Sequence, residues 1–374
     1  MNAERIPHPI EKVIVSACTL PTDLPEADGT IGWDATTIVL VEVAAGDLQG
    51  IGYSYADLSA ADYAARRLAP AALGRDPMAV AAAWDAMRRL CRNDGRPGIV
   101  AHAVSAVDVA LWDLKARTLG LPLAALLGKA RSAIPVYGSG GFTSYTAETL
   151  REQMRGWAEL GIRAVKMKVG SDPPADPDRV ATVRRAVGDD VAVFVDANGA
   201  FTRKQALAFA ERVRSLGVSW FEEPVSSDDL DGLRLLRDRA PAGMDIAAGE
   251  YGYDPVDFRR MLAAGAVDVL QADATRCQGI SGFMEVGALC RAYGLPLSAH
   301  TAPSLHAHAC CALSNAIHLE YFHDHARIEQ MLFAGTLPPT DGVLRPDPLR
   351  PGLGLELNLP EVERFRVFRQ EVTA

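Results

Sequence analysis

The chain has 374 residues, of which 49% are hydrophobic and 23% are charged, a composition typical of a soluble globular protein. Its formal net charge of −9 argues against nucleic acid as a partner. No apolar run reaches the roughly 20 residues that span a bilayer, and the N-terminus lacks the apolar segment of a signal peptide. We therefore expect a cytoplasmic protein with no membrane partner. The length suits a barrel with a smaller domain attached.

The cysteines show no CxxC spacing, which argues against a structural zinc site built on thiolates. They lie mostly among apolar residues, as reduced and buried thiols do. The six positions are Cys18, Cys91, Cys277, Cys290, Cys310 and Cys311.

The first part of the chain predicts an α+β domain. Three segments have the alternation of strands, at residues 12–20, 37–43 and 50–55. A turn at Gly46-Asp47 joins the last two strands, and the polar segment 21–34 is expected to be a loop. Three helical patterns follow, at residues 60–72, 77–93 and 98–118. Gly120 and Pro122 end the third helix.

From about residue 131 the pattern changes to short apolar strands that alternate with helices, which is typical of parallel βαβ units. Thr146, Thr202 and Asp254 are the expected start signals of three of these helices. The strands are expected at residues 134–138, 164–169, 191–196, 218–223, 245–250, 267–273, 296–300 and 317–321. Eight such units predict an α/β fold with a closed (β/α)8-type barrel.

After residue 330 the alternation stops and the chain becomes rich in proline and glycine. We expect this last segment to return to the N-terminal domain. The predicted organisation is therefore an N-terminal α+β capping domain at residues 1–130, a barrel domain at 131–330, and a C-terminal segment at 331–374 that completes the capping domain.

The second barrel strand contains two lysines, Lys166 and Lys168, that alternate with apolar residues and so share one face of the strand. A solvated edge strand would explain them, but the apolar flanks favour burial. Two neighbouring ammonium groups lower each other's pKa. We therefore predict that a lysine of this pair acts as a base near neutral pH.

Ionisable residues stand at the C-terminal ends of the barrel strands, the face on which barrel enzymes carry their active sites. In chain order they are Lys166, Lys168, Asp196, Glu222, Glu250, Asp273, His300 and Glu320. Asp196, Glu222 and Glu250 come from adjacent strands, so their carboxylates can converge. A set of oxygen ligands favours a hard cation, and we expect Mg2+.

The last three of these strands supply a further acid/base group. A carboxylate such as Asp273 beside an imidazole such as His300 fixes the tautomer of the ring and raises its basicity. Glu320 is expected to donate a hydrogen bond to a substrate oxygen if burial raises its pKa. The pairs His306/His308 and His323/His325 are interpreted as structural or as facing another copy of the chain.

Other side chains are expected to contact the substrate or to support the metal ligands. Asn198 and Glu223 follow two of the ligand candidates closely, and Glu223 is expected to lie behind them. The first barrel strand and the N-terminal domain add Tyr137, Ser139, Trp33, Tyr53 and Tyr55.

Taken together, these residues resemble the enolase superfamily, and within it the mandelate racemase subgroup, over essentially the whole chain. The resemblance is carried by residues 110–116, Lys166-x-Lys168, Asp196-Ala197-Asn198, residues 220–224, Ala248-Gly249-Glu250, Asp273-Ala274, Ser298-Ala299-His300 and residues 351–355. Relatives of the muconate-lactonising and dipeptide-epimerase types have a lysine on the sixth strand. This chain instead has Asp273, followed by His300, which indicates the subgroup.

The resemblance implies a role for each site residue. It implies Mg2+ on Asp196, Glu222 and Glu250, Lys168 as one base tuned by Lys166, the Asp273–His300 dyad as the other, and Glu320 hydrogen-bonded to the substrate carboxylate. Arg276 stands where the family often has a basic residue behind the ligands. The resemblance also implies an oligomer of identical chains.

The expected activity is Mg2+-dependent removal of the α-proton of a small carboxylate substrate through an enediolate. Expulsion of a β-hydroxyl with His300 as the acid would make the protein an acid-sugar dehydratase, and the polar segment 21–34 favours this outcome. Return of the proton would make it a racemase or epimerase, or a cycloisomerase, of a hydroxy or sugar acid. A non-catalytic ligand-binding barrel is disfavoured, because so many unpaired buried charges would be costly without a function.

Overall fold

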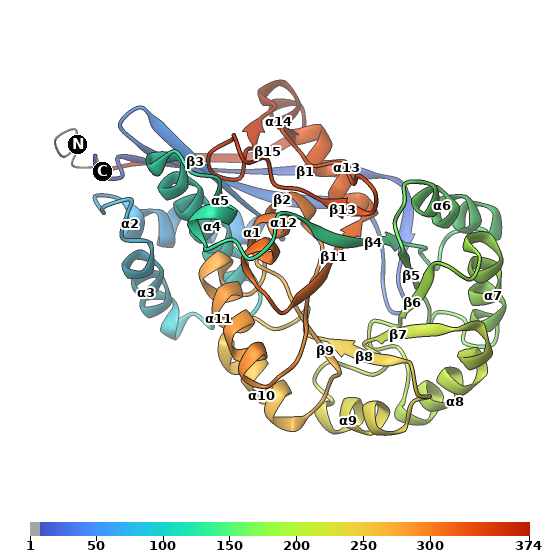
Figure 1. The fold of residues 1–374 in the computed structure, drawn as a ribbon. Helices are drawn as coiled ribbons and strands as arrows, with labels where there is room; N and C mark the ends of the chain where they lie inside the picture. Colours follow the sequence, from blue (N-terminus) through green and yellow to red (C-terminus); the bar gives the residue numbers. More distant parts are fainter. Residues whose placement is uncertain (1–7) are drawn as a thin grey trace.

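The computed structural model of the protein describes residues 8–374, so residues 1–7, the predicted start of the capping domain, lie outside the described residues. Figure 1 shows a barrel beside a smaller α+β unit. The predicted fold class is confirmed, because the barrel strands are parallel and closed and the N-terminal sheet is antiparallel. Among the described residues, no helix is both long and apolar enough to cross a membrane.

Eight parallel strands form the barrel in the part of the chain that the structure describes, and pairing of the last with the first closes it. They are β4 (Ile134–Gly140), β5 (Ala164–Lys168), β6 (Ala192–Asp196), β7 (Val218–Glu222), β8 (Asp245–Ala248), β9 (Val269–Ala272), β10 (Leu297–Ala299) and β11 (Ala316–Phe322). Each lies at or within a few residues of a predicted strand.

Helices cover the outside of the barrel (Figure 1). They are α6 (Ala147–Glu159), α7 (Asp176–Val187), α8 (Arg203–Val213), α9 (Leu230–Arg239), α10 (Pro255–Ala264), α11 (Gly279–Ala292), α12 (Pro303–Ala312) and α13 (His323–Leu332). The side chains of Thr146, Thr202 and Asp254 accept backbone hydrogen bonds at the starts of α6, α8 and α10, which confirms the predicted start signals.

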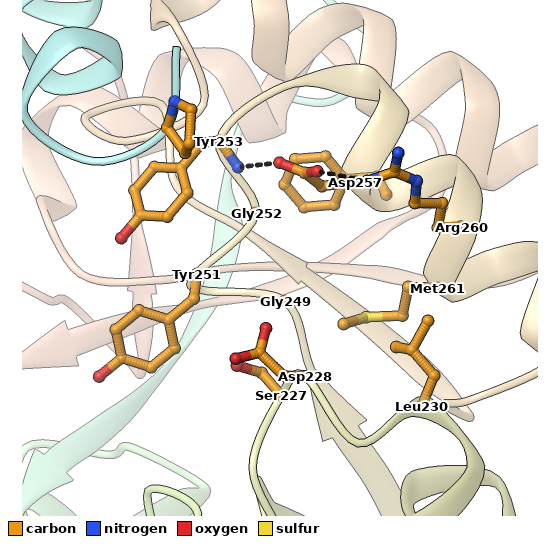
Figure 2. Close-up of a pocket in the computed structure, with 12 residues that line it drawn as sticks. Ser227, Asp228, Leu230, Gly249, Tyr251, Gly252, Tyr253, Asp257, Arg260 and Met261 are labelled. Carbon is orange, nitrogen blue, oxygen red and sulfur yellow. Dashed lines mark hydrogen bonds and ion pairs between the residues drawn. The ribbon is translucent and has the colours of Figure 1, made fainter. Parts of the chain in front are cut away.

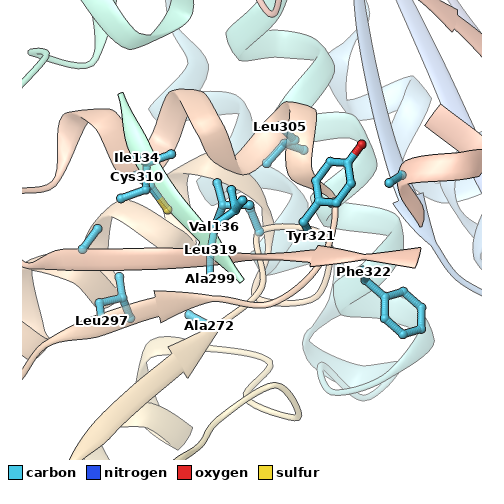
Figure 3. Close-up of a cluster of buried hydrophobic side chains, with 14 of the residues drawn as sticks. Ile134, Val136, Ala272, Leu297, Ala299, Leu305, Cys310, Leu319, Tyr321 and Phe322 are labelled. Carbon is cyan, nitrogen blue, oxygen red and sulfur yellow. The ribbon is translucent and has the colours of Figure 1, made fainter. Parts of the chain in front are cut away.

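Alternation along the strands divides the barrel core into an inner and an outer part. On the outer side, Val136 of β4 and Leu319 of β11 belong to one cluster with Leu305 and Cys310 of α12 (Figure 3). On the inner side, Tyr137 lies among Phe194, Trp220, Ala247 and Val269. The inner cluster fills the barrel, so polar chemistry is confined to its mouth.

The capping unit has a four-stranded antiparallel sheet with helices packed on it. The strands are β1 (Lys12–Ala27), β2 (Gly32–Ala45), β3 (Leu48–Tyr55) and β15 (Arg366–Thr373), in the order β15-β1-β2-β3. The helices are α1 (Leu58–Tyr63), α2 (Ala69–Ala72), α3 (Val80–Leu90), α4 (Ile99–Leu119) and α5 (Leu123–Leu126). Glycine is needed at Gly52, because a Cβ there would lie 2.2 Å from the carbonyl oxygen of Ala106 in α4.

The predicted loop at residues 21–34 is wrong, since most of it is strand. β1 continues to Ala27 and β2 begins at Gly32, with a shift of register between Pro21 and Glu26. The two strand ends form a hairpin, residues 21–34, which we call the capping hairpin. Polar residues do not imply an irregular backbone here, because a strand can be as polar as a loop. Asp23 and Asp34 of the hairpin are exposed, whereas Glu26 and Asp28 are buried.

The last segment returns to both parts of the fold. It contains β12 (Phe333–Ala334), β13 (Val343–Leu344), β14 (Glu356–Leu357), α14 (Leu359–Phe365) and β15. β13 pairs with β4 of the barrel, and β15 pairs antiparallel with β1. The C-terminal strand is therefore an edge of the capping sheet.

Candidate active site

The charged residues of the strand ends meet at one mouth of the barrel. Lys168 is the register partner of Asp196, and Asp196 is the register partner of Glu222. Oxygen atoms of Asp196, Glu222 and Glu250 lie within 4.8 Å of one another, and all three residues are buried. Parallel pairing thus brings Asp196 and Glu222 together, and Glu250 joins them from the segment that follows β8.

The oxygen atoms of this cluster suit a divalent cation. Buried oxygens of Asn198, Glu223 and Glu250 have no hydrogen-bond partner. Burial, reinforced by Glu250 and Asp196, raises the pKa of Glu223 well above its ordinary value. Buried oxygens without partners and an excess of negative charge are what a hard cation with oxygen ligands would relieve. Mg2+ therefore fits the residues present, and Asp196, Glu222 and Glu250 are the residues that could hold it.

Both lysines are paired with carboxylates, and their environments differ. Lys166 is fully buried and contacts Glu222 and Glu320, the latter at 2.9 Å. Lys168 Nζ lies 2.6 Å from Asp196 Oδ2 and faces a cavity. Burial disfavours the ammonium form, but these carboxylates outweigh it and hold the pKa of both lysines above the ordinary value. The expected lowering of the lysine pKa is therefore wrong for this arrangement, because each ammonium group has a carboxylate oxygen within 3 Å, Asp196 for Lys168 and Glu320 for Lys166.

His300 and Asp273 form a hydrogen-bonded dyad. His300 Nδ1 lies 2.8 Å from Asp273 Oδ2. Burial would raise the pKa of Asp273, but the hydrogen bond and charge of His300 outweigh it and hold that pKa below its usual range. An ionised Asp273 accepts the proton of Nδ1, which leaves Nε2 to exchange a proton with a bound molecule. Nε2 lies 3.3 Å from Glu250 Oε2 and 3.8 Å from Glu320 Oε2.

Glu320 accepts hydrogen bonds in this site. Ser139 Oγ and the backbone N–H of Thr301 both donate to its carboxylate. Burial would raise its pKa, but Lys166 and His300 outweigh burial and lower the pKa of Glu320 to about 2. The expectation that a raised pKa lets Glu320 donate a hydrogen bond is therefore wrong for this arrangement.

These groups form the floor of a cavity of about 360 Å³, and the capping unit forms its roof. The floor residues are Lys168, Asn198, Glu250, Arg276, His300 and Glu320. The roof residues include Asp28, Ile31, Trp33, Thr36, Thr37, Tyr55 and Asp57. The volume suits a small ligand, and both the floor and the roof carry groups that can hydrogen-bond to it.

The structure brings only some of the predicted substrate contacts to this cavity. Trp33, Tyr55, Asn198 and Arg276 line it. Glu223 and Ser139 lie behind the carboxylates.

Two predicted contacts lie elsewhere. Tyr53 is fully buried and its hydroxyl donates to Glu329 Oε1 at 2.7 Å. Tyr137 is fully buried inside the barrel, where its hydroxyl accepts a hydrogen bond from Gln271. Neither tyrosine is in reach of a ligand in the cavity.

Several residues at the site were not predicted from the sequence. His325 lines the cavity and stacks on Tyr55 with ring centroids 3.3 Å apart, so the prediction of a structural or oligomer-facing role does not hold for it. Thr301 and His325 follow closely after strand ends, and that position was a usable signal. Tyr251 also lines the cavity and has the same signal, three residues after the end of β8. Thr36 and Thr37 line the cavity too, but nothing in their sequence context distinguishes them.

A larger cavity of about 540 Å³ lies beside the first, along the segments that follow β7 and β8 (Figure 2). Tyr251 lines both cavities, and the guanidinium of Arg276 lies 5.1 Å from the centre of its ring. Of the strand-end acids and bases, none lines this second cavity. The chemistry therefore belongs to the smaller one.

The chain matches two family models. Residues 13–128 match the mandelate racemase/muconate lactonizing enzyme N-terminal domain, and residues 149–362 match the enolase C-terminal domain-like family. Between them they cover the capping helices and the whole set of strand-end residues from Lys166 to Glu320.

Two characterised relatives have similar levels of identity. L-talarate/galactarate dehydratase of Salmonella typhimurium is 32% identical over 345 residues, which are 89% of this chain and 85% of the relative. D-galactarolactone cycloisomerase of Agrobacterium fabrum is 30% identical over 313 residues, which are 79% of this chain and 82% of the relative.

Solved structures agree with the fold in detail. A mandelate racemase/muconate lactonizing enzyme-like protein from Rubrobacter xylanophilus is 54% identical, with a TM-score of 0.94 over 96% of this chain and 100% of that one. L-talarate dehydratase from Polaromonas sp. JS666, complexed with Mg and L-glucarate, is 32% identical. Its TM-score is 0.88, and the match covers 98% of this chain and 99% of that one.

Proposed function

Because the chain belongs to the mandelate racemase/muconate lactonizing enzyme family of the enolase superfamily, we propose that it is a Mg2+-dependent acid-sugar dehydratase. It would remove the α-proton of a sugar acid and expel the β-hydroxyl, giving a 2-keto-3-deoxy acid. The observation that carries this proposal is that one cavity is lined by two separate proton-transfer groups, Lys168 and His300, beside the carboxylate cluster.

The residues of the chain divide the reaction between them. Lys168 accepts the α-proton after its ion pair with Asp196 is broken. Lys166 keeps its positive charge beside the carboxylates of the cluster. His300, oriented by Asp273, gives a proton from Nε2 to the leaving hydroxyl. Asp196, Glu222 and Glu250 would hold Mg2+, which would supply positive charge to stabilise the anion that develops on the substrate carboxylate. The capping roof excludes water while these steps occur.

The roof supports a hydroxylated substrate. Asp28, Thr36, Thr37, Tyr55 and Asp57 offer donors and acceptors along one wall, which match a polyhydroxy chain better than an aryl group. Relatives named as dehydratases of talarate/galactarate, arabinonate, gluconate and rhamnonate act on substrates of that class.

Cycloisomerisation is the second candidate. Relatives named D-galactarolactone cycloisomerase and 3,6-anhydro-alpha-L-galactonate cycloisomerase are 30% and 32% identical, a level comparable to that of the dehydratases. Removal of an α-proton also begins a ring-opening elimination, so the same two bases would serve. A racemase or epimerase would need only the return of the proton.

The test is proton NMR in D2O with Mg2+ and a panel of aldonic acids, aldaric acids and their lactones. A 2-keto-3-deoxy product from an open-chain acid is the expected result. Product from a lactone alone would replace this proposal with the cycloisomerase, and loss of the α-proton signal without product would replace it with a racemase or epimerase. Asp196→Asn should abolish turnover and the Mg2+-dependent rise in Tm. Asp62→Asn, which changes an exposed carboxylate of α1, should alter neither.

We also propose a cytoplasmic location and self-association. All six cysteines are free and buried, which is compatible with a reducing compartment. Self-association stays a prediction, which size-exclusion chromatography with light scattering tests.

A further inference from the structure

A second group of potential metal ligands lies outside the active site. Asp23 and Glu26 belong to β1 in the capping hairpin, and His323 is the first residue of α13. One ligand atom of each lies within 4.8 Å of the others. His323 Nε2 is already 2.9 Å from Asp23 Oδ2. The group therefore joins the hairpin to the barrel.

One member of the group is a buried carboxylate with an unpartnered oxygen. Glu26 is only 1% exposed. Its Oε2 accepts a hydrogen bond from Trp33 Nε1 at 2.8 Å, whereas its Oε1 is buried and accepts none from residues 8–374. A buried carboxylate oxygen without a donor is costly, which indicates that a partner is missing at this position. Asp23 is exposed and His323 is half-buried, which leaves a route for that partner from solvent.

The neighbouring charges also favour a cation. Asp23 and Asp324 lie close enough to Glu26 to add negative charge around it. The nearby basic side chain of Arg327 is engaged by Asp324 and by the carbonyl oxygen of Pro21. Negative charge around Glu26 is therefore only partly balanced by the residues of the chain.

The donor atoms suggest which class of cation fits. One imidazole nitrogen and two carboxylate oxygens suit zinc and similar transition metals, whereas Mg2+ prefers oxygen ligands alone. Tetrahedral zinc with bonds of about 2.0 Å places its ligand atoms about 3.3 Å apart. The three ligand atoms lie within 4.8 Å of one another, so rotation of the side chains can bring them towards that spacing, and a water molecule would complete the site.

We propose that Asp23, Glu26 and His323 form a zinc-type site that fastens the capping hairpin to α13. The site is separate from the carboxylate cluster at the barrel mouth. The hairpin carries Asp28 and Trp33 of the active-site roof, and Trp33 is bonded directly to Glu26. An ion at this site therefore holds the roof in place without touching the substrate.

The test measures zinc content after equilibrium dialysis of the full chain against Zn2+ with a large excess of Mg2+. His323→Ala and Asp23→Asn should each contain one zinc ion per chain fewer than the wild type. His8→Ala is the control, because His8 is an exposed histidine near a carboxylate, Glu11, outside the proposed site, and should retain the wild-type zinc content. Equal zinc content in the wild type and His323→Ala would overturn the proposal.

Two further measurements make the result specific to this site. Anomalous diffraction at the zinc edge should place an ion between the three side chains, and a peak confined to the barrel mouth would overturn the proposal. Zn2+ should also slow amide hydrogen exchange in residues 21–34 of the wild type but not of His323→Ala. The Mg2+-dependent rise in Tm should persist in both variants, which shows that they fold and separates this test from that of the proposed function.

Discussion

The two lysines of β5 have different positions although they share one strand face. Lys166 is enclosed by Glu222, Glu320 and Asp196, whereas Lys168 reaches the cavity. Lys166 is thus placed to balance charge, and Lys168 to exchange a proton. The alternation in the sequence revealed the pair but not this difference, because the difference depends on carboxylates from other strands.

This difference predicts unequal effects on stability. Lys166→Met removes the cation that faces three buried carboxylates and should lower the free energy of unfolding by on the order of 3 kcal/mol or more. Lys168→Met leaves Asp196 with Lys166 at 3.4 Å and should cost less than half as much. Denaturant unfolding without added metal measures both values. Equal losses would show that Lys166 does not balance the cluster.

A substitution of His300 is expected to separate dehydration from exchange of the α-proton. His300→Asn should lower kcat for dehydration by at least about 100-fold, because the leaving hydroxyl loses its proton donor. Exchange of the substrate α-proton with D2O should persist if that proton faces Lys168, and NMR follows exchange and product formation in one sample. Lys168→Met should stop both processes. Dehydration at the wild-type rate in His300→Asn would exclude His300 as the acid.

Individual tyrosines show the limit of prediction at the residue scale. Tyr53 and Tyr55 share a face of β3 by alternation, yet only Tyr55, at the strand end, reaches the cavity. The charged residues were easier to place, because each stands at the C-terminal end of a barrel strand. The direction of a pKa shift was not predictable, since it depends on distances between side chains from different strands.

At the scale of elements, local sequence patterns predicted the barrel strands and the helix starts. They did not predict the capping hairpin. Its polar residues gave no apolar alternation, and its backbone is shaped by contacts with the barrel. Thr143 Oγ1 donates to the carbonyl oxygen of Asp28 at 2.7 Å, and Ser144 Oγ donates to that of Pro25. Such distant contacts are not encoded in the local sequence.

A substitution at the tip of the capping hairpin is expected to lower activity. A Cβ at Gly29 would lie 2.5 Å from Ala197 O and 2.6 Å from Val169 O, both backbone atoms. Gly29→Ala should therefore lift the hairpin from the barrel mouth, and kcat/KM should fall by about tenfold for a strain of ~1–2 kcal/mol. Gly156→Ala in α6 is a control for global stability, because its Cβ would meet no described atom within 4 Å and its backbone is helical. Steady-state kinetics with unchanged activity in Gly29→Ala would show that the roof tolerates the displacement.

At the scale of the whole molecule, the capping unit and the barrel share buried polar contacts. Glu329 of α13 accepts hydrogen bonds from Tyr53 of β3 and from the backbone N–H of Ser304. Asp108 of α4 accepts hydrogen bonds from Ser281 of α11. Burial raises the pKa of each carboxyl group to about 7. The sequence predicted that the two parts meet, but not that acids lie between them.

These acids predict a dependence of stability on pH. Because the pKa of Glu329 in the folded chain is above its ordinary value of 4.5, the folded chain binds that proton more tightly than the unfolded chain does. Its contribution to the free energy of unfolding is full below pH 4.5, falls as the pH rises to about 7, and is then lost, a change on the order of 3 kcal/mol. Glu329→Gln should flatten this part of the profile, measured by denaturant unfolding from pH 5 to 8. Glu285→Gln, an exposed glutamate on α11, should leave it unchanged, and an unchanged profile in Glu329→Gln would contradict the assignment.

The pairing of β15 with β1 also has a consequence for the order of events during synthesis. Lys12 of the first strand pairs with Thr373 of the last, almost the full length of the chain away. A contact of such high sequence separation forms late, because closing a long loop is entropically costly. A nascent chain on the ribosome should therefore complete its barrel while one edge of β1 is still open. That edge is a ready site for pairing with another chain, so a chaperone that shields exposed strands would be most useful to this protein in the interval before residue 366 emerges.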